Sequence, residues 1–318
     1  MFKFNIFAAA ITGLTVNAAV IPALAEDFPT GPIEVINNSK PGGGSDIFLR
    51  FATEQTAEIL DTSFIHLSKT GGVATNALKY VAGKPADGQT LFLVNAGTAL
   101  TMMRGKGGIE REDITPLVRG TVEAEYVVVQ ADRFADAAAF VEFAKSNSIK
   151  QAGTKVGGNA HVNALIMRNA IGMDQQVYVP FEKSGEIVIN LINGNVDVAL
   201  LNYDEFASQA KAGQVEALAV LMPERSPNAP DIPTGYEVGI PVEVPNVRGI
   251  GVRAGTPEDV IQKLEEALLA SMNSEGFVNY LKGAGQDTSS IAGREVFSEQ
   301  FERMYQGYQS VATDLMGG

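Results

Sequence analysis

Apolar positions along this chain fall into two alternating patterns. Short, nearly continuous apolar runs are typical of strands buried on both faces, and segments such as residues 45–60 carry apolar residues at helical spacing. The alternation predicts an α/β protein with largely parallel sheets. We expect strands at 33–36, 64–67, 91–94, 126–129, 151–154, 177–179, 196–201 and 217–221, and helices at 45–60, 75–82, 136–145, 161–171, 184–192 and 204–212.

The pattern changes between Pro223 and Pro245, where six prolines exclude regular elements. We interpret this stretch as an extended connection that returns to the first part of the fold. Pro257 then stands near the first position of a strong helix, and a further helix is expected over residues 294–315. The apolar face of the helix after Pro257 consists of Val260, Ile261, Leu264, Ala267, Leu268 and Met272.

The first residues resemble an export signal. Lys3 is followed by an apolar run and then by Ala23-Leu24-Ala25, a small-x-small pattern of the kind that signal peptidase cleaves. The run is too short for a spanning helix, which needs roughly 20 apolar residues. We therefore expect residues 1–25 to be a cleaved signal peptide and the protein to be periplasmic.

Charge and cysteine content exclude several classes of protein. The net charge of −13 disfavours nucleic acid and anionic membranes as partners. The chain has no Cys, which excludes a thiol nucleophile, a cysteine metal site and a disulfide scaffold. Because the long-range field repels anions, any anion site must be built locally.

Three glycine-rich loops, at residues 40–46, 68–74 and 157–161, each stand between a predicted strand and a predicted helix. Glycine lets the backbone approach a ligand closely, and the helix N-terminus that follows favours a carboxylate or another oxyanion. A tight turn without a ligand is the alternative for each loop. Asp46 either caps its helix or accepts a hydrogen bond from a ligand.

Catalytic motifs are scarce. No Gly-x-Ser-x-Gly elbow and no nucleotide-binding glycine pattern is present. His66 lies in an apolar strand and is interpreted as a packing residue. His161 follows a glycine loop at the start of a predicted helix, so a contact with a ligand and a purely structural role are both open for it. Asp197 is expected to end a turn and Asp204 to cap a helix, so an acid pair that includes them is disfavoured. We expect no enzymatic activity, cofactor or metal.

Seven ordered motifs resemble the Bug-type substrate-binding receptors of tripartite tricarboxylate transporters, over about residues 32–285. The first two are Lys-Pro-Gly-Gly-Gly-Ser-Asp and Thr-Gly-Gly-Val-Ala-Thr-Asn. The others are residues 85–91, 193–199, 212–220, 231–234 and 255–257. Residues 38–41 and Ser68-Lys69 depart from the usual family pattern, so Lys40 or Lys69 either adds a cation near the ligand or is a solvated surface residue.

The resemblance implies a two-lobed periplasmic-binding fold that closes on its ligand near Glu125 and Val247. Lobe 1 would comprise residues 26–125 and 248–318, and lobe 2 residues 126–247. It also implies a monomer that binds a small carboxylate and passes it to two integral membrane subunits. The implied ligand-binding residues are Gly43, Gly44, Ser45, Asp46, Thr70, Gly71, Asn95, Gly97, Thr98, Gly158, Asn159, His161, Asn202, Tyr203 and Asp204.

Two other functions remain open at this point. A receptor that signals to a membrane protein would use the same pocket, and a secreted hydrolase of small carboxylates would turn its ligand over. The identity of the carboxylate is also open, although Tyr203 and His161 are placed to stack on an aromatic ring if the ligand has one.

Overall fold

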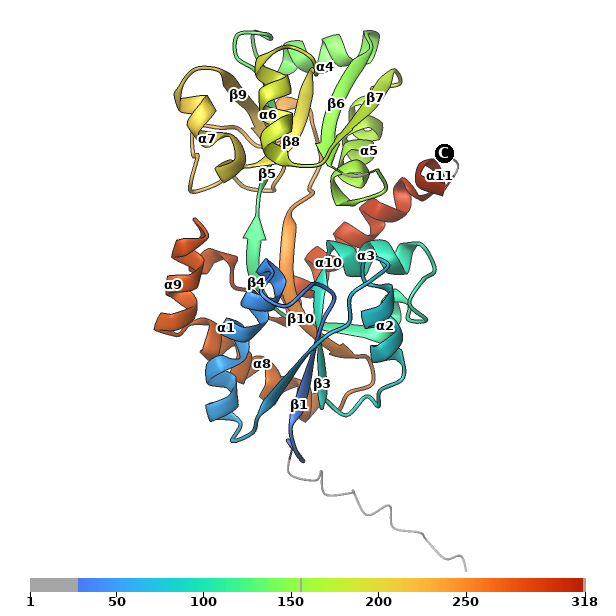
Figure 1. Ribbon diagram of the computed structural model, residues 1–318, viewed down its shortest axis with the longest axis vertical. Helices are drawn as coiled ribbons and strands as arrows, with labels where there is room; N and C mark the ends of the chain where they lie inside the picture. The colour runs from blue at the N-terminus through green and yellow to red at the C-terminus, as the bar shows by residue number, and fades with distance from the viewer. Residues whose placement is uncertain (1–27, 155, 317–318) are drawn as a thin grey trace, which may run out of the picture.

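The computed structural model describes residues 28–154 and 156–316. These residues form two α/β lobes, each built on a five-stranded sheet with helices packed on it (Figure 1). The predicted signal peptide, residues 1–25, lies outside the described residues. Within the described ranges, no helix is long and apolar enough to cross a membrane.

Lobe 1 has the strand order β2-β1-β3-β10-β4. Strand β1 pairs in parallel with β2 and β3, whereas β10 runs antiparallel to β3 and β4. Alternate side chains of β1 enter different cores: Ile33 and Val35 face one and Ile36 the other. The strands are β1 (Ile33–Asn37), β2 (Phe64–Ser68), β3 (Thr90–Asn95), β4 (Ile114–Glu123) and β10 (Asn246–Arg253).

The helices of lobe 1 form two layers. One core is shared by α1, α8 and α9, and the other by α2, α3 and α10. All six residues of the apolar face predicted after Pro257 are buried in α8. The helices are α1 (Gly44–Ile59), α2 (Thr75–Ala82), α3 (Ala96–Met103), α8 (Glu258–Met272), α9 (Glu275–Gly283), α10 (Arg294–Ser310) and α11 (Ala312–Met316), with short 3-10 turns at Arg111–Asp113 and Thr288–Ser290.

Lobe 2 repeats this plan with the strand order β7-β6-β8-β5-β9. Strand β6 pairs in parallel with β7 and β8, and β5 runs antiparallel to β8 and β9. Helices α4 and α5 share one core, and α6 and α7 the other. The elements are β5 (Glu125–Gln130), α4 (Ala137–Ser146), β6 (Ile149–Thr154), α5 (Asn159–Ile171), β7 (Gln176–Phe181), α6 (Ser184–Ile192), β8 (Val198–Asn202), α7 (Tyr203–Lys211) and β9 (Val215–Val220).

The chain passes between the sheets twice (Figure 1). From β4 to β5 it crosses through a single residue, Ala124, and it returns from β9 to β10 through the proline-containing stretch 221–245, which holds a 3-10 turn at Tyr236–Val238. Helix α10 also bridges the lobes, because it packs on β4 and α3 and then reaches α5. There the Tyr308 hydroxyl donates a hydrogen bond to the Asn159 side chain.

The predicted two-lobed α/β fold is confirmed, but both sheets are mixed. Strands β5 and β10, which the chain enters directly after crossing, run antiparallel to their neighbours. Asp136 caps α4 as expected, since its carboxylate accepts the N–H of Ala139 at 2.8 Å. The elements α3, β4, β10 and α9 were not anticipated from the sequence pattern.

Candidate ligand-binding site

The predicted ligand-binding residues lie on loops that follow strands. The first two glycine loops follow β1 and β2 in lobe 1, and the third follows β6 in lobe 2. In Figure 1 the carboxyl ends of β1 and β3 point towards lobe 2 and those of β6 and β8 towards lobe 1. This is the edge at which open α/β sheets bind their ligands.

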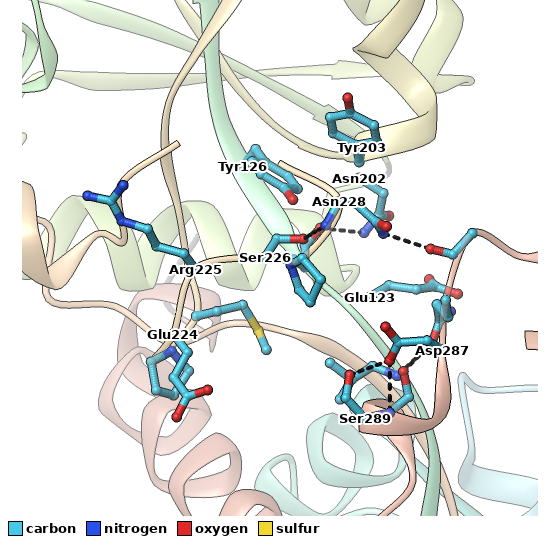
Figure 2. A pocket seen from close by; sticks show the side chains of 18 of the residues that line it. Glu123, Tyr126, Asn202, Tyr203, Glu224, Arg225, Ser226, Asn228, Asp287 and Ser289 are labelled. Atoms are coloured by element: carbon cyan, nitrogen blue, oxygen red, sulfur yellow. Dashed lines mark hydrogen bonds between the residues drawn. The ribbon is translucent and has the colours of Figure 1, made fainter. Parts of the chain in front are cut away.

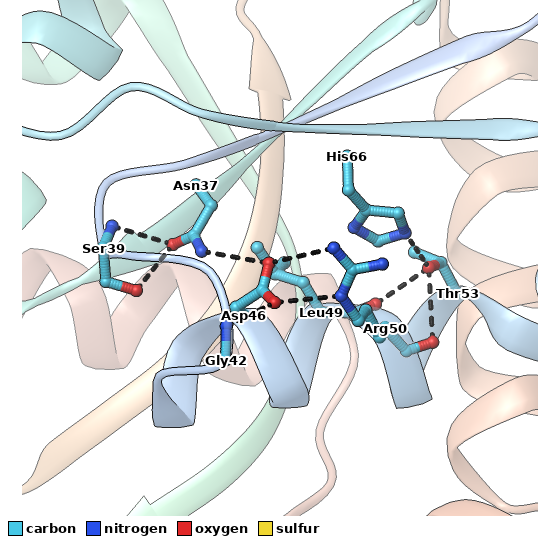
Figure 3. Close-up of polar contacts among 8 residues, drawn as sticks. All are labelled: Asn37, Ser39, Gly42, Asp46, Leu49, Arg50, Thr53 and His66. Carbon is cyan, nitrogen blue, oxygen red and sulfur yellow. Dashed lines mark hydrogen bonds and ion pairs between the residues drawn. The ribbon is translucent and has the colours of Figure 1, made fainter.

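The first glycine loop is held from beneath by Asp46 (Figure 3). Gly43 is the N-cap residue of α1, so Asp46 is not the helix cap; it lies in the first turn and is 3% exposed. Its Oδ2 accepts the N–H of Gly42 at 3.0 Å and Nε–H of Arg50 at 2.9 Å. Burial alone would raise the pKa of Asp46, but these bonds to Arg50 and Gly42 outweigh it and lower the pKa.

Two further contacts fix the same loop. Asn37, at the end of β1, donates Nδ2–H to Asp46 at 3.5 Å, and its Oδ1 accepts the backbone N–H of Ser39 at 3.0 Å. Gly42 has a φ of 76°, which suits glycine. The carboxylate of Asp46 is therefore part of the loop's support, and Gly43, Gly44 and Ser45 form its surface.

The three strand-end loops of lobe 1 meet at Gly97. A methyl group placed on Gly97 would lie 3.2 Å from the Val73 side chain, 3.2 Å from Asn95 Oδ1 and 3.6 Å from Asn38 Nδ2. Asn38 itself donates to Asn95 at 3.3 Å. Residues from the ends of β1, β2 and β3 therefore converge on Gly97 so closely that a side chain there would be crowded.

Thr98 has a structural task next to this point. Its side chain is fully buried, its backbone N–H donates to Asn95 Oδ1 at 3.1 Å, and its hydroxyl donates to the carbonyl of Leu93 at 3.0 Å. Thr98 and Asn95 thus cap α3 together, and the Thr98 hydroxyl is directed into the lobe.

The second glycine loop has an unusual backbone. Gly71, Gly72 and Val73 follow one another with φ of 117°, 57° and 65°. The carbonyl of Thr70 accepts Nδ2–H of Asn76 at 2.8 Å, which ties the loop to α2. Lys69 does not add a cation here, because its ammonium group lies 4.1 Å above the ring of Tyr80. Lys40 is exposed on the first loop.

A cation that sequence reasoning missed is Arg248. It pairs in register with Asn95 across β3 and β10, and its Nη2 lies 3.8 Å from the position that a methyl group on Gly44 would take. Its guanidinium also pairs with Glu123, and the two side chains are 20% and 26% exposed. Arg248 therefore stands beside the N-terminus of α1, with part of its surface open to solvent.

The third glycine loop is held in part by lobe 1. Arg104, which ends α3, donates to the carbonyl of Gly157 at 2.6 Å, and Tyr308 of α10 donates to Asn159. Gly158 is the N-cap residue of α5. His161 accepts the N–H of Gly157 at its Nδ1 at 3.1 Å, and its ring lies 4.3 Å from that of Tyr178.

The surroundings of His161 favour the neutral form of its imidazole. Burial lowers its pKa, and the charges of Arg168 and Arg104 lower it further. A neutral ring is what the hydrogen bond from Gly157 requires, because Nδ1 must carry a free lone pair. His161 therefore shapes the third loop.

The residues after β8 begin helix α7. The sequence predicted Asp204 as the N-cap residue, but the N-cap residue is Asn202, because β8 continues through Asn202 and α7 begins directly after it. Asp204 is exposed in the first turn. The Tyr203 ring packs against Tyr126 and Phe206, with centroids 5.9 and 5.6 Å away. Across the described residues, no group of three or more His, Asp or Glu is arranged to hold a metal ion.

A cavity of about 480 Å³, here called the hinge cavity, lies between the lobes beside the strands that connect them (Figure 2). None of the three glycine loops lines it. Of the predicted ligand-binding residues it includes Asn202, Tyr203 and Asp204 alone, so the predicted set falls into two groups. The other labelled residues around it are Glu123, Tyr126, Glu224, Arg225, Ser226, Asn228, Asp287 and Ser289.

Residues 48–303 match the sequence pattern of the tripartite tricarboxylate transporter family receptor. The chain belongs to this receptor family. The receptor is 24% identical to the protein BugT of Bordetella pertussis over 286 residues, which cover 87% of each chain.

The fold of the receptor is that of known periplasmic binding proteins. A TctC solute-binding protein from Polaromonas, solved with no ligand, superposes with a TM-score of 0.83 at 21% identity, covering 90% of this chain and 99% of that one. MatC of Rhodopseudomonas palustris, solved with bound malate, superposes with a TM-score of 0.64 at 23% identity, covering 90% of the receptor and 100% of MatC. These likenesses establish the two-lobed fold.

Proposed function

We propose that this receptor captures a small carboxylate in the periplasm, between the glycine loops of its two lobes, and delivers it to the membrane subunits of a tripartite tricarboxylate-type transporter. The observation that carries the proposal is the meeting of three strand-end loops at Gly97, with Arg248 beside the neighbouring N-terminus of α1. The N-terminal N–H groups of α1, the amide side chains and the guanidinium all offer hydrogen-bond donors to an anion.

Local donors are necessary in this protein because its overall charge opposes anion binding. With a net charge of −13, the long-range field does not attract a carboxylate. A site built from oriented N–H groups avoids this difficulty, because its partial charges act at contact distance. Arg248 adds the full positive charge that the backbone donors lack.

Arg248 is paired with Glu123. The carboxylate of Glu123 accepts hydrogen bonds from Arg248 and from Asn246 Nδ2, the latter at 2.8 Å. An arriving ligand carboxylate would occupy the donors of Arg248 that face Gly44 and share the guanidinium with Glu123. Arginine suits this because its planar fork offers five N–H donors.

Known relatives support the ligand class and the transfer step. MatC was solved with malate, a small dicarboxylate, and the family description names a transporter receptor. Closure of the lobes about Ala124 and the 221–245 connection would bring the third glycine loop over the ligand. Small-angle scattering should then show a smaller radius of gyration at saturating ligand, and an unchanged radius would contradict closure.

The proposal is tested by a thermal-shift screen against linear, branched and aromatic mono-, di- and tricarboxylates. A ligand at about 100 times its dissociation constant should stabilise the receptor by roughly 2.7 kcal/mol. Folded, ligand-free protein that gives no shift with any carboxylate would reject the carboxylate function.

Arg248→Gln should weaken binding of the best ligand by about 2 kcal/mol, or roughly 30-fold in affinity, because one charge-assisted hydrogen bond is lost. Glu123→Gln is the matched variant: it leaves Arg248 charged and should preserve or tighten binding. Arg294→Gln removes a guanidinium paired with Glu258 elsewhere in lobe 1 and should leave affinity unchanged. Equal affinity in wild type and Arg248→Gln would remove Arg248 from the site.

A further inference from the structure

Val73 has a backbone conformation that its side chain disfavours. Its φ of 65° lies in the left-handed region, which β-branched residues rarely adopt. Among the described residues, the other non-glycine residues with positive φ are Asp61 and Asp132, and aspartate tolerates this region far better. A valine held there stores strain, and such strain is concentrated at ligand-binding sites.

The surrounding structure forces this conformation. On one side of Val73, the carbonyl of Gly72 accepts the Thr75 hydroxyl at 2.7 Å and the Thr75 N–H at 3.0 Å. On the other side, the N–H of Ala74 donates to the buried hydroxyl of Thr101 at 3.2 Å. Val73 therefore cannot relax to negative φ without breaking contacts to both α2 and α3.

The strained residue presents an apolar side chain where the strand-end loops of lobe 1 meet. Val73 is 45% exposed, although valine is normally buried. Its Cγ1 lies 3.2 Å from the methyl position of Gly97, next to the amides of Asn38 and Asn95. The amides of Asn38 and Asn95 and the backbone of Gly97 are polar, so Val73 is the apolar member of this group of residues.

We propose that Val73 is a specificity-determining residue, whose isopropyl group packs on the aliphatic part of the bound carboxylate and restricts its width beside Gly97. This inference rests on the proposed function and adds the shape of the ligand to it. A linear aliphatic carboxylate fits along the exposed side of Val73, next to the amides of Asn38 and Asn95. A branched or aromatic carboxylate meets the valine methyl groups.

The test compares Val73→Gly and Val73→Ala with wild type by calorimetric titration against succinate, glutarate, adipate, benzoate and phenylacetate. Loss of the valine methyl groups should weaken the preferred linear ligand roughly 4- to 15-fold. The aromatic acids should lose less or gain, so the ratio of linear to aromatic affinity should fall in both variants.

Thermal unfolding separates the strain from the contact. Val73→Gly should raise Tm by about 2–4 °C, because glycine adopts positive φ freely, whereas Val73→Ala should not. Asp132→Gly, at the turn after β5, is the matched control and should leave the ligand preference unchanged.

A wild type that binds carboxylates while both Val73 variants keep its preference would overturn the inference and leave the proposed function standing. A wild type that binds neither this panel nor any carboxylate of the thermal-shift screen would reject the proposed function, and this inference with it. A rise in Tm without a change in preference would show that Val73 is strained but makes no ligand contact, which also overturns the inference.

Discussion

The first glycine loop and the third are both followed by a helix, but their supports differ. The first loop is fixed by Asn37, Asp46 and Arg50, which all belong to lobe 1. The third loop belongs to lobe 2 and is fixed in part by Arg104 and Tyr308 of lobe 1. The first loop is thus shaped independently of lobe 2, whereas the shape of the third loop depends on how the lobes are placed.

The helices that follow the two loops are each associated with a carboxyl group, and the two groups differ in character. Asp46, under the first loop, has a lowered pKa. Glu125, on β5, is buried and accepts Nδ2–H of Asn163 in α5 at 3.1 Å. Burial raises the pKa of Glu125 to about 8, despite the hydrogen bond from Asn163. Near pH 7 the carboxyl group in the first turn of α1 is therefore charged, and the one bonded to α5 is mostly neutral.

The largest expected effect follows from Glu125. Because its folded pKa lies above its unfolded value of 4.5, its contribution to stability is complete below pH 4.5 and is lost as the pH rises towards 8. Glu125→Gln should remove this loss, which amounts to about 1.4 kcal/mol per pH unit within the window. Urea unfolding from pH 4.5 to 8 measures the slope. Glu142→Gln, an exposed change, should keep the wild-type slope, and parallel curves for wild type and Glu125→Gln would refute the assignment.

Asp46→Ala should have the next largest effect and break the support of the first loop. Removing the carboxylate leaves the Gly42 N–H and the Asn37 amide without their acceptor, at a cost of about 2–3 kcal/mol in the free energy of unfolding. Hydrogen exchange should accelerate at residues 41–44 and remain slow at the third loop.

Asp136→Ala is the reference variant for Asp46→Ala, because it removes an exposed helix cap and should lower the free energy of unfolding by about 1 kcal/mol. In the wild type, the contribution of Asp46 to stability changes with pH in the direction opposite to that of Glu125. It is present above pH 3.8 and is lost as the pH falls through the lowered pKa of Asp46. An Asp46→Ala variant no less stable than Asp136→Ala would mean that the first loop does not depend on its carboxylate.

Arg104→Gln should have the smallest effect on stability, below about 1 kcal/mol, because it removes one partly exposed hydrogen bond between the lobes. Its effect should appear instead as faster hydrogen exchange at residues 156–161, with the first loop unchanged. Arg294→Gln, which does not touch lobe 2, should leave both loops as they are. Unaltered exchange at 156–161 would show that lobe 1 does not support the third loop.

Sequence patterns predicted the regular elements well where local and global preferences agree. The apolar face of α8 and the limits of α2 were read directly from helical spacing. Strand β10 was missed because it contains Gly249 and Gly251, which resemble turn residues. In the structure Gly249 is needed for packing, since a methyl group there would lie 2.3 Å from the Phe297 ring. Because Gly249 is required by contact with a helix far along the chain, it leaves no periodic signal in the sequence. Arg248 lies on the same strand and was therefore not predicted either.

The candidate site shows the same limit. Glycine loops were recognisable because they stand between strands and helices, and they do lie on the facing edges of the two sheets. The placement of Asn202, Tyr203 and Asp204 at the hinge cavity, and the strain at Val73, depend on the backbone path and on partners far along the chain. No local pattern carries that information.

The single residue between β4 and β5 has a mechanical consequence. Ala124 is too short a tether for the lobes to slide along or away from each other, whereas the long 221–245 connection can follow almost any displacement. Two rigid bodies normally have six degrees of relative freedom, and this joint suppresses the three translations. For rigid lobes, what remains is rotation about one point, so a force from a bound ligand would act as a torque about Ala124 that grows with the distance of the contact from that pivot.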